Sequence, residues 1–357
     1  MSITTMSTAE ATAAPAPATE TEPAAKPRSG AVDLVRVLGI VAVVAGHTLV
    51  SPTTRTLLYS WHVPLFFVLA GYFWSPHRTL GRELLTRFRT LLRPMLTWLV
   101  LIGTVFLILD LQLEDTTWQR LAGPLADGEN SALPFTTFWF VTALFFSAVL
   151  LRMLWLLPRP VTWAVAGVGL LLSVTAGPQL ANTPLSVGSA VPCVAFLALG
   201  VIARALRPRI ARPALVGAAL LAVSAVLVVT GTTRPLDIKQ GDFGTPVLST
   251  VVAVAISFGL ILTAEALFRK APPRVGRAVT VLAYGGFMVV LTHPLVLWLM
   301  KTYGPPVPSA LLFALCLLIP WAVALAALAT RASAWLTGVE PAVSSPSCTS
   351  AAPPSGR

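Results

Sequence analysis

The sequence predicts an all-α membrane protein of about ten transmembrane helices, N-in and C-in, with disordered termini. Three observations lead to this prediction. First, 55% of the 357 residues are hydrophobic and only 11% are charged, with a mean hydropathy of +0.79. Second, apolar runs long enough to cross a bilayer recur along the chain. Third, Lys and Arg gather in alternate connections between these runs. A water-soluble domain would need far more charge to cover its surface.

Each predicted span is an apolar run bounded by polar residues, glycine or proline. Pro94, Pro213 and Pro246 stand at the start of three of them, where proline fits a helix. The spans are predicted at residues 32–50, 58–75, 94–110, 135–151, 161–177, 189–203, 213–231, 246–268, 278–300 and 308–330.

The orientation follows from the distribution of basic residues. With the N-terminus in the cytoplasm, 20 of the 25 Lys and Arg residues lie on the cytoplasmic side. The positive-inside rule then favours a multi-pass protein of the cytoplasmic membrane with both ends inside. The formal net charge of +11 therefore reflects topology and membrane lipid, and it does not indicate a nucleic-acid partner. The Ala- and Arg-rich, Lys-poor composition favours a GC-rich bacterial source.

Three regions follow from composition. Residues 1–30 are rich in Ala, Thr, Pro and Glu and are predicted to be a disordered cytoplasmic leader, while residues 37–50 as a signal segment is the weaker alternative. Residues 31–331 form the membrane domain, and residues 332–357 are predicted to be a disordered cytoplasmic tail. The cysteines at 193, 316 and 348 do not have the spacing of a metal site or a disulfide framework, so no metal is predicted.

The first span carries ionisable residues, which are costly inside a membrane and indicate function by default. Asp33 and Arg36 are three residues apart and can pair on one helix surface. Arg36 and His47 are eleven residues apart, which places them within about 20° of one face and roughly 16 Å apart along the axis. A structural alternative stays open: Arg36 can be a snorkelling end residue and His47 an interfacial histidine.

Two further histidines lie in apolar segments. His62 begins the second span and shares the extracytoplasmic end with His47, either as an interfacial residue or as a supporting one. His293 lies deep in the ninth span before Pro294, and it can bond the helix backbone, contact a neighbouring helix or line a site. The basic connection at residues 77–94 can contact anionic lipid headgroups or bind a phosphorylated substrate.

Several segments, in this order, are similar to motifs of one known family. They are DLVRVLGIVAVVAGHT at 33–48, WHVPLFFVLAGYFW at 61–74, RFRTLLRP at 87–94, FWFVTALFF at 138–146, LDIKQGDFGTP at 236–246 and LTHPLV at 291–296. Their order and spacing resemble the acyltransferase 3 family of integral membrane acyltransferases, and within it the fucose 4-O-acetylase-like branch. Ala70 stands where the family usually has serine before Gly-Tyr, and the helix before His293 lacks a usual serine.

The resemblance implies an O-acetyltransferase, in the class of acyltransferases that move groups other than aminoacyl groups. It implies acyl-CoA, most often acetyl-CoA, as donor substrate, with no bound cofactor. The acceptor would be a hydroxyl, usually on a sugar of a glycoconjugate, a polysaccharide or a glycosylated natural product. His47 would be catalytic with Arg36 as its partner on the same span. The expected supporting residues are Asp33, His62, Tyr72 and His293, and the expected phosphate-binding residues are Arg87, Arg89 and Arg93.

A neutral imidazole at His47 can take a proton from a hydroxyl that attacks a thioester, and an acyl-histidine intermediate is the alternative. The competing functions are a transporter or flippase and a non-catalytic membrane partner of a sugar-modifying complex. The sequence shows no convincing internal repeat and few acidic residues within the spans, which disfavours a transporter.

Overall fold

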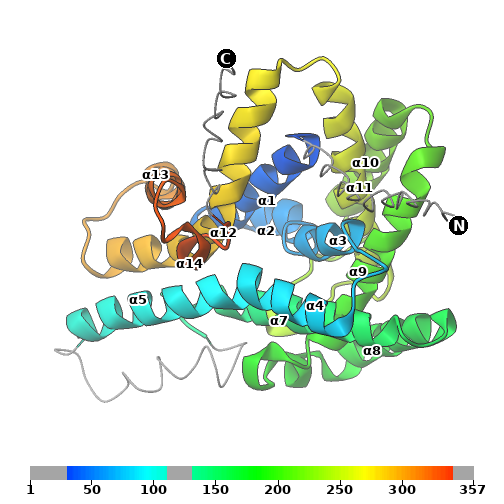
Figure 1. The fold of residues 1–357 in the computed structure, drawn as a ribbon, viewed down its shortest axis with the longest axis horizontal. Helices are drawn as coiled ribbons and strands as arrows, with labels where there is room; N and C mark the ends of the chain where they lie inside the picture. The colour runs from blue at the N-terminus through cyan, green and yellow to red at the C-terminus, as the bar shows by residue number, and fades with distance from the viewer. Residues whose placement is uncertain (1–29, 111–130, 341–357) are drawn as a thin grey trace, which may run out of the picture.

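The protein is a bundle of helices in which long apolar segments surround a central polar site. The computed structural model describes residues 30–110 and 131–340, and the regular elements in these ranges are helical apart from one β-bridge between Asp237 and Asp242. Figure 1 shows α5 and α4 running across the lower part of the view, below α1, α3 and α12 and over α7. In chain order the helices are α1 (Gly30–Thr48), α2 (Pro52–Tyr59), α3 (Pro64–Tyr72), α4 (Leu80–Arg87), α5 (Arg93–Asp110), α7 (Phe138–Leu154), α8 (Arg159–Ala181), α9 (Ala190–Leu206), α10 (Pro213–Val229), α11 (Leu248–Phe268), α12 (Pro273–Thr302), α13 (Ser309–Leu328) and α14 (Ser333–Leu336).

The prediction of an all-α, multi-span membrane protein is confirmed. Seven helical stretches of the described chain are long and apolar enough to cross a membrane, and α7 and α10 are shorter apolar helices. Each predicted span coincides with a helix except the second. The prediction of one continuous helix at residues 58–75 was wrong. This span is divided into α2 and α3 at residues 60–63, where Pro64 starts α3. Val63 keeps helical φ and ψ, so the break follows from the missing backbone N–H of Pro64, which donates no hydrogen bond to the preceding turn.

The basic segment between the second and third spans is helical, and the sequence-based assignment of a connection at 77–94 was wrong in this respect. Residues 80–87 form α4, which continues through a π-helical turn at Phe88–Leu92 into α5. The side chain of Thr79 caps α4 by accepting a hydrogen bond from the backbone N–H of Arg82, and Glu83 pairs with Arg87 one turn on. A local cap and an i,i+4 ion pair thus favour a helix that a hydropathy scan alone misses.

The first residues of the predicted C-terminal tail are helical. Residues 333–336, expected to be disordered, form α14, and Trp98 of α5 donates its indole N–H to the carbonyl of Leu336 over 2.8 Å. The rest of the predicted tail beyond residue 340, and the predicted leader up to residue 29, lie outside the described residues.

Helices α1 and α12 run parallel and side by side. Asp33 contacts Thr280, the side chain of Ile40 meets Gly286, and His47 contacts His293, so one register is kept along both helices. A Cβ atom at Gly286 would lie 2.1 Å from Cδ1 of Ile40, so a larger residue here would force the Ile40 side chain to move. Parallel first and ninth spans are what the predicted ten-span order requires. The direction in which the bundle crosses the membrane stays a prediction.

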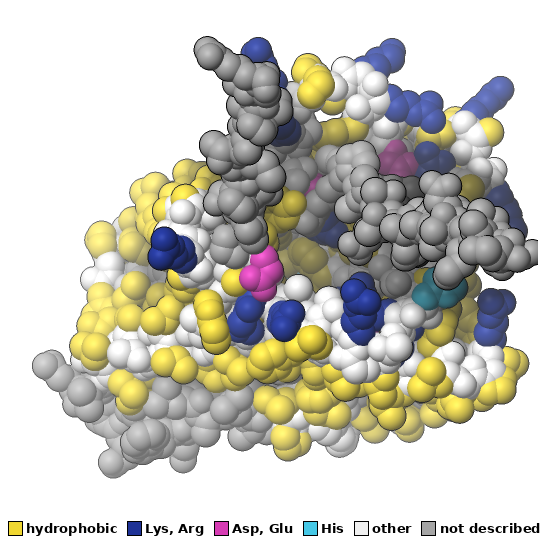
Figure 2. Space-filling view, in the orientation of Figure 1, with side chains coloured by type: hydrophobic (Ala, Val, Ile, Leu, Met, Phe, Trp, Pro, Cys, Tyr) yellow, Lys and Arg dark blue, Asp and Glu magenta, His cyan; other side chains and the backbone are white. Residues whose placement is uncertain are grey.

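Charged and apolar surfaces are separated on the molecule. In the view of Figure 2, Lys and Arg gather at the top and right over the connections α9–α10 and α11–α12, and hydrophobic side chains cover the left and lower parts. Two of the basic connections that the sequence assigns to one side of the membrane thus lie near each other.

Candidate active site

Helices α1 and α12 bring two histidines into direct contact in the middle of the bundle. Nδ1 of His47 lies 3.2 Å from Nε2 of His293, and the two rings are tilted by 47°. His293 is fully buried and His47 partly buried. The parallel register described above therefore joins two of the sequence-predicted residues that are 246 positions apart. The sequence left three roles open for His293, and the structure places it both on its own backbone and against the neighbouring helix.

The backbone acceptors determine which ring nitrogen of each histidine carries the proton. Nδ1 faces the carbonyl of the residue four positions earlier in His47 (2.9 Å), His62 (2.7 Å) and His293 (3.0 Å). A carbonyl only accepts, so these contacts assign the hydrogen to Nδ1 in all three rings. His47 then donates from Nδ1 toward His293 Nε2, and its own Nε2 keeps a lone pair. This is the tautomer that a general base needs.

His62 completes the polar group from the turn between α2 and α3. It is buried, its ring packs against Tyr59 with centroids 4.8 Å apart, and its Nε2 faces α1 at Gly46. His47 and His62 both line one pocket, here called the histidine pocket. The pocket is lined by Val43, His47, Tyr59, His62, Val63, Phe66, Thr137, Trp139, Phe140, Leu236, Asp237, Ile238, Lys239 and Val290.

A second and larger cavity lies beside the other end of α1 and is here called the arginine cavity. Its lining includes Arg36, Arg87 and Tyr284, together with residues 337–339 that follow α14. Nη1 of Arg36 donates to Oδ1 of Asp33 over 2.5 Å, and Thr280 donates to the other carboxylate oxygen over 2.9 Å. The pairing of Asp33 with Arg36 that the sequence predicts is confirmed. The buried carboxylate of Asp33 holds the guanidinium at the cavity wall.

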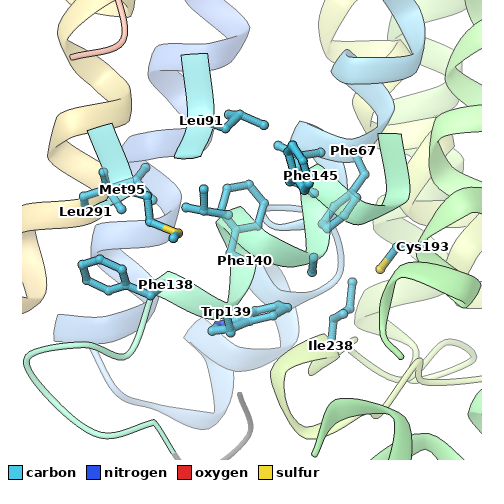
Figure 3. Packing of buried hydrophobic residues seen from close by; sticks show 14 of the residues in the cluster. Phe67, Leu91, Met95, Phe138, Trp139, Phe140, Phe145, Cys193, Ile238 and Leu291 are labelled. Atoms are coloured by element: carbon cyan, nitrogen blue, oxygen red, sulfur yellow. The ribbon is translucent and has the colours of Figure 1, made fainter. Parts of the chain in front are cut away.

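The two cavities share one wall. Phe66, Phe140 and Val290 line both the histidine pocket and the arginine cavity. Figure 3 shows Phe140 between Leu91, which faces the arginine cavity, and Trp139, which lines the histidine pocket. These three side chains therefore lie between the two spaces.

The three arginines predicted to bind phosphate have different surroundings. Arg87 lines the arginine cavity, and its Nε donates to Glu83 over 2.7 Å. Arg93 instead pairs with Glu340 at 2.9 Å and lies over the ring of Trp335. Arg89 is exposed and is not among the described residues that line the arginine cavity. Only Arg87 thus joins Arg36 at the cavity wall.

Tyr72 belongs to a different cluster. Its hydroxyl faces Glu265 at 3.4 Å, Arg204 lies over its ring, and Glu265 forms an ion pair with Arg207. Tyr72 is not among the described residues that line either cavity. Of the predicted supporting residues, the structure therefore groups Asp33, His62 and His293 with the site and leaves Tyr72 apart.

Sequence reasoning did not single out several residues of these sites. Thr137 and Trp139 from the start of α7, and Lys239 from the connection between α10 and α11, line the histidine pocket. Both segments were noticed as similar to a family, but no pattern within them marked individual residues. Glu83 was also missed: it is buried and pairs with Arg78 at 2.8 Å and Arg87 at 2.7 Å, while Arg152 lies 3.6 Å away. The sequence pattern that could have identified Glu83 is a single acidic residue within a segment rich in arginine.

Comparison with known proteins agrees with this geometry. Residues 29–331 match the family model acyltransferase 3, described as an acyltransferase domain. The chain belongs to the acyltransferase 3 family. It is therefore a membrane acyltransferase, and the polar site lies within the matched domain. The match does not reach the level of the fucose 4-O-acetylase branch, which stays a prediction. No curated protein and no solved structure matches the chain significantly.

Proposed function

We propose that this acyltransferase moves an acetyl group from acetyl-CoA to a hydroxyl of a carbohydrate, in a glycoconjugate, a polysaccharide or a glycosylated natural product. The observation that carries the proposal is the contact between His47 and His293 beside a pocket that shares a wall with an arginine-lined cavity. The geometry offers a base at one end of a route and cations at the other.

The donor would enter from the end of α1 that carries Arg36, which we assign to the cytoplasm. Guanidinium groups bind phosphate oxygens with two parallel hydrogen bonds, so Arg36 and Arg87 suit the phosphates of acyl-CoA. Arg36 pairs with Asp33 and Arg87 with Glu83, and a guanidinium has five N–H donors, so a carboxylate and a phosphate can be bound by the same side chain. The thin arm of the donor would then pass Phe66, Phe140 and Val290 and present its thioester in the histidine pocket.

The reaction would proceed as a direct transfer. Nε2 of His47 takes the proton of the acceptor hydroxyl while that oxygen attacks the thioester carbonyl carbon. The new C–O bond forms, the C–S bond breaks, and the thiolate takes the proton back from His47. His293 supports this step because its Nε2 accepts from Nδ1–H of His47, which becomes a stronger donor when the ring is protonated. An acceptor on the far side of the membrane would reach His47 past the connection that carries Lys239.

Replacement of the proposed base tests this function. Purified protein in lipid nanodiscs is given acetyl-CoA labelled in the acetyl group and the glycolipid and oligosaccharide fraction of the producing cell. We expect His47→Ala to lower label transfer by about 100- to 10,000-fold, the usual contribution of general base catalysis. His77→Ala is the matched control, because His77 is exposed outside both cavities.

Three outcomes would contradict the proposal. Label transfer by correctly inserted His47→Ala at the wild-type rate would remove His47 from the chemistry. Label on lipid or protein instead of carbohydrate would change the acceptor class. Movement of a glycolipid across the bilayer without consumption of acetyl-CoA would favour the transporter alternative.

A further inference from the structure

Thr137 has a buried hydroxyl without a partner. Its side chain is 4% exposed, and Oγ1 finds no hydrogen-bond partner in the part of the chain that the structure describes. Two other buried threonines bond their own helix: Thr142 donates to the carbonyl of Trp139 over 2.9 Å, and Thr292 to that of Met288 over 2.8 Å. Thr250 and Thr263 also have unpartnered hydroxyls, but neither lines the histidine pocket. An unpaired buried hydroxyl costs free energy, and such groups are found where a ligand or a reaction uses them.

Thr137 lies at the wall of the site. Thr137 lines the histidine pocket together with His47 and His62. It is also the N-cap residue of α7, a position where threonine normally accepts a hydrogen bond from a backbone N–H of the first turn, but here its side chain makes no such bond. The start of this 17-residue helix therefore reaches the pocket uncapped, and Trp139 and Phe140 of its first turn line the same space. A helix N-terminus carries partial positive charge and favours anions.

Lys239 fixes this segment in place. Its ammonium group donates to the carbonyl of Ser131 over 2.7 Å and to the hydroxyl of Thr136 over 2.8 Å. The residue before Thr137 is thereby tied to the connection between α10 and α11, which also lines the pocket. The backbone at the start of α7 is thus held by contacts outside its own helix, as a positioned functional group requires.

We propose that Thr137 is a catalytic hydrogen-bond donor that stabilises the oxyanion of acyl transfer. This proposal rests on the proposed function. When the acceptor oxygen attacks the thioester carbonyl carbon, the π electrons of that carbonyl move onto its oxygen. Thr137 donates its hydroxyl hydrogen to this oxygen, and the N-terminus of α7 adds its field. Collapse restores the carbonyl, breaks the C–S bond, and leaves Thr137 with its hydrogen. Its hydroxyl has no partner in the absence of substrate because its acceptor appears during the reaction.

Two substitutions of Thr137 test this role in the nanodisc assay. Thr137→Val keeps the shape and removes the donor, so we expect kcat to fall about 100- to 1,000-fold, with KM for acetyl-CoA within about threefold. Thr137→Ser keeps the donor and should stay within about tenfold of wild type. Thr137→Val should also unfold at the same or a higher temperature, because it removes an unpaired buried hydroxyl.

Thr142→Val is the matched control on the same helix. It removes a buried hydroxyl that has a partner, so we expect a lower unfolding temperature with kcat within about threefold of wild type. The opposite patterns of the two valine variants separate a role in the reaction from a role in folding.

The inference would be overturned if Thr137→Val kept a wild-type kcat, if Thr137→Ser lost as much as Thr137→Val, or if both valine variants lost kcat and stability together. These results would leave the loss in His47→Ala intact, so the proposed function would survive them. If the wild-type protein transferred no label to carbohydrate, the proposed function would fail first, and the role of Thr137 in that reaction would fail with it.

Discussion

The contact between His47 and His293 makes a specific prediction for His293→Ala. The wild-type ring offers Nε2 as an acceptor 3.2 Å from Nδ1 of His47, while its own Nδ1 lies 3.0 Å from the carbonyl of Val289. Alanine removes the acceptor and leaves His47 with the carbonyl of Val43, 2.9 Å from the same nitrogen. His47 keeps its tautomer but loses support on the side facing α12.

The size of the effect follows from the charge that His47 gains. A hydrogen bond to a charged group contributes about 1.5–3 kcal/mol, and each 1.36 kcal/mol in the barrier changes the rate about tenfold. Full loss of the contact would therefore lower kcat by about 10- to 150-fold. Because the Val43 carbonyl stays in place, we expect the lower part of this range, about 10- to 50-fold, with little change in KM for acetyl-CoA.

Steady-state transfer of labelled acetyl groups in nanodiscs measures both constants. His293→Gln can return an acceptor near His47 and should recover part of the loss, whereas Thr292→Val on the same helix should leave kcat close to wild type. A kcat within twofold of wild type for His293→Ala would refute the reasoning. A loss as large as that of His47→Ala would also refute it, because His293 would then itself take the proton.

Two further predictions concern the arginine-rich end of the bundle. Glu83→Gln removes the buried charge that pairs with Arg87 and lies 3.6 Å from the buried Arg152, so we expect a loss of about 3–5 kcal/mol. A thermal unfolding midpoint equal to wild type would contradict this. Arg93→Glu breaks the 2.9 Å pair with Glu340 beside the wall of the arginine cavity, and it should raise KM for acetyl-CoA up to about fivefold, as expected for about 1 kcal/mol. The added change Glu340→Arg should restore KM; if it does not, Arg93 binds the donor itself.

Local features of the sequence could be predicted well. Apolar runs of about 20 residues identify membrane helices, because a bilayer requires that length and satisfied backbone groups. The pairing of Asp33 with Arg36 follows from a spacing of three on a helix. The same periodicity places Arg36 and His47 on one face, and each lines a cavity beside α1.

Other features could not be predicted, because they depend on which surfaces meet. Tyr72 was expected near His47, but α3 presents it toward Glu265 of α11. The packing of α3 on α9 explains this: a Cβ atom at Gly71 would lie 1.9 Å from the carbonyl oxygen of Leu197, so this glycine turns toward α9 and fixes the rotation of α3. An apolar helix carries no pattern that reveals such a rotation.

The sequence by itself determined that the chain is a helical membrane protein and that one span carries an acid, an arginine and a histidine. These properties depend on composition and on distances within a single helix. Only the tertiary structure decided that His293 supports His47, that two cavities meet at a shared wall, and that the hydroxyl of Thr137 is left without a partner beside them. The reason is physical: contacts between distant helices depend on how both side-chain surfaces fit, as Gly286 against Ile40 shows, and no local pattern contains both surfaces.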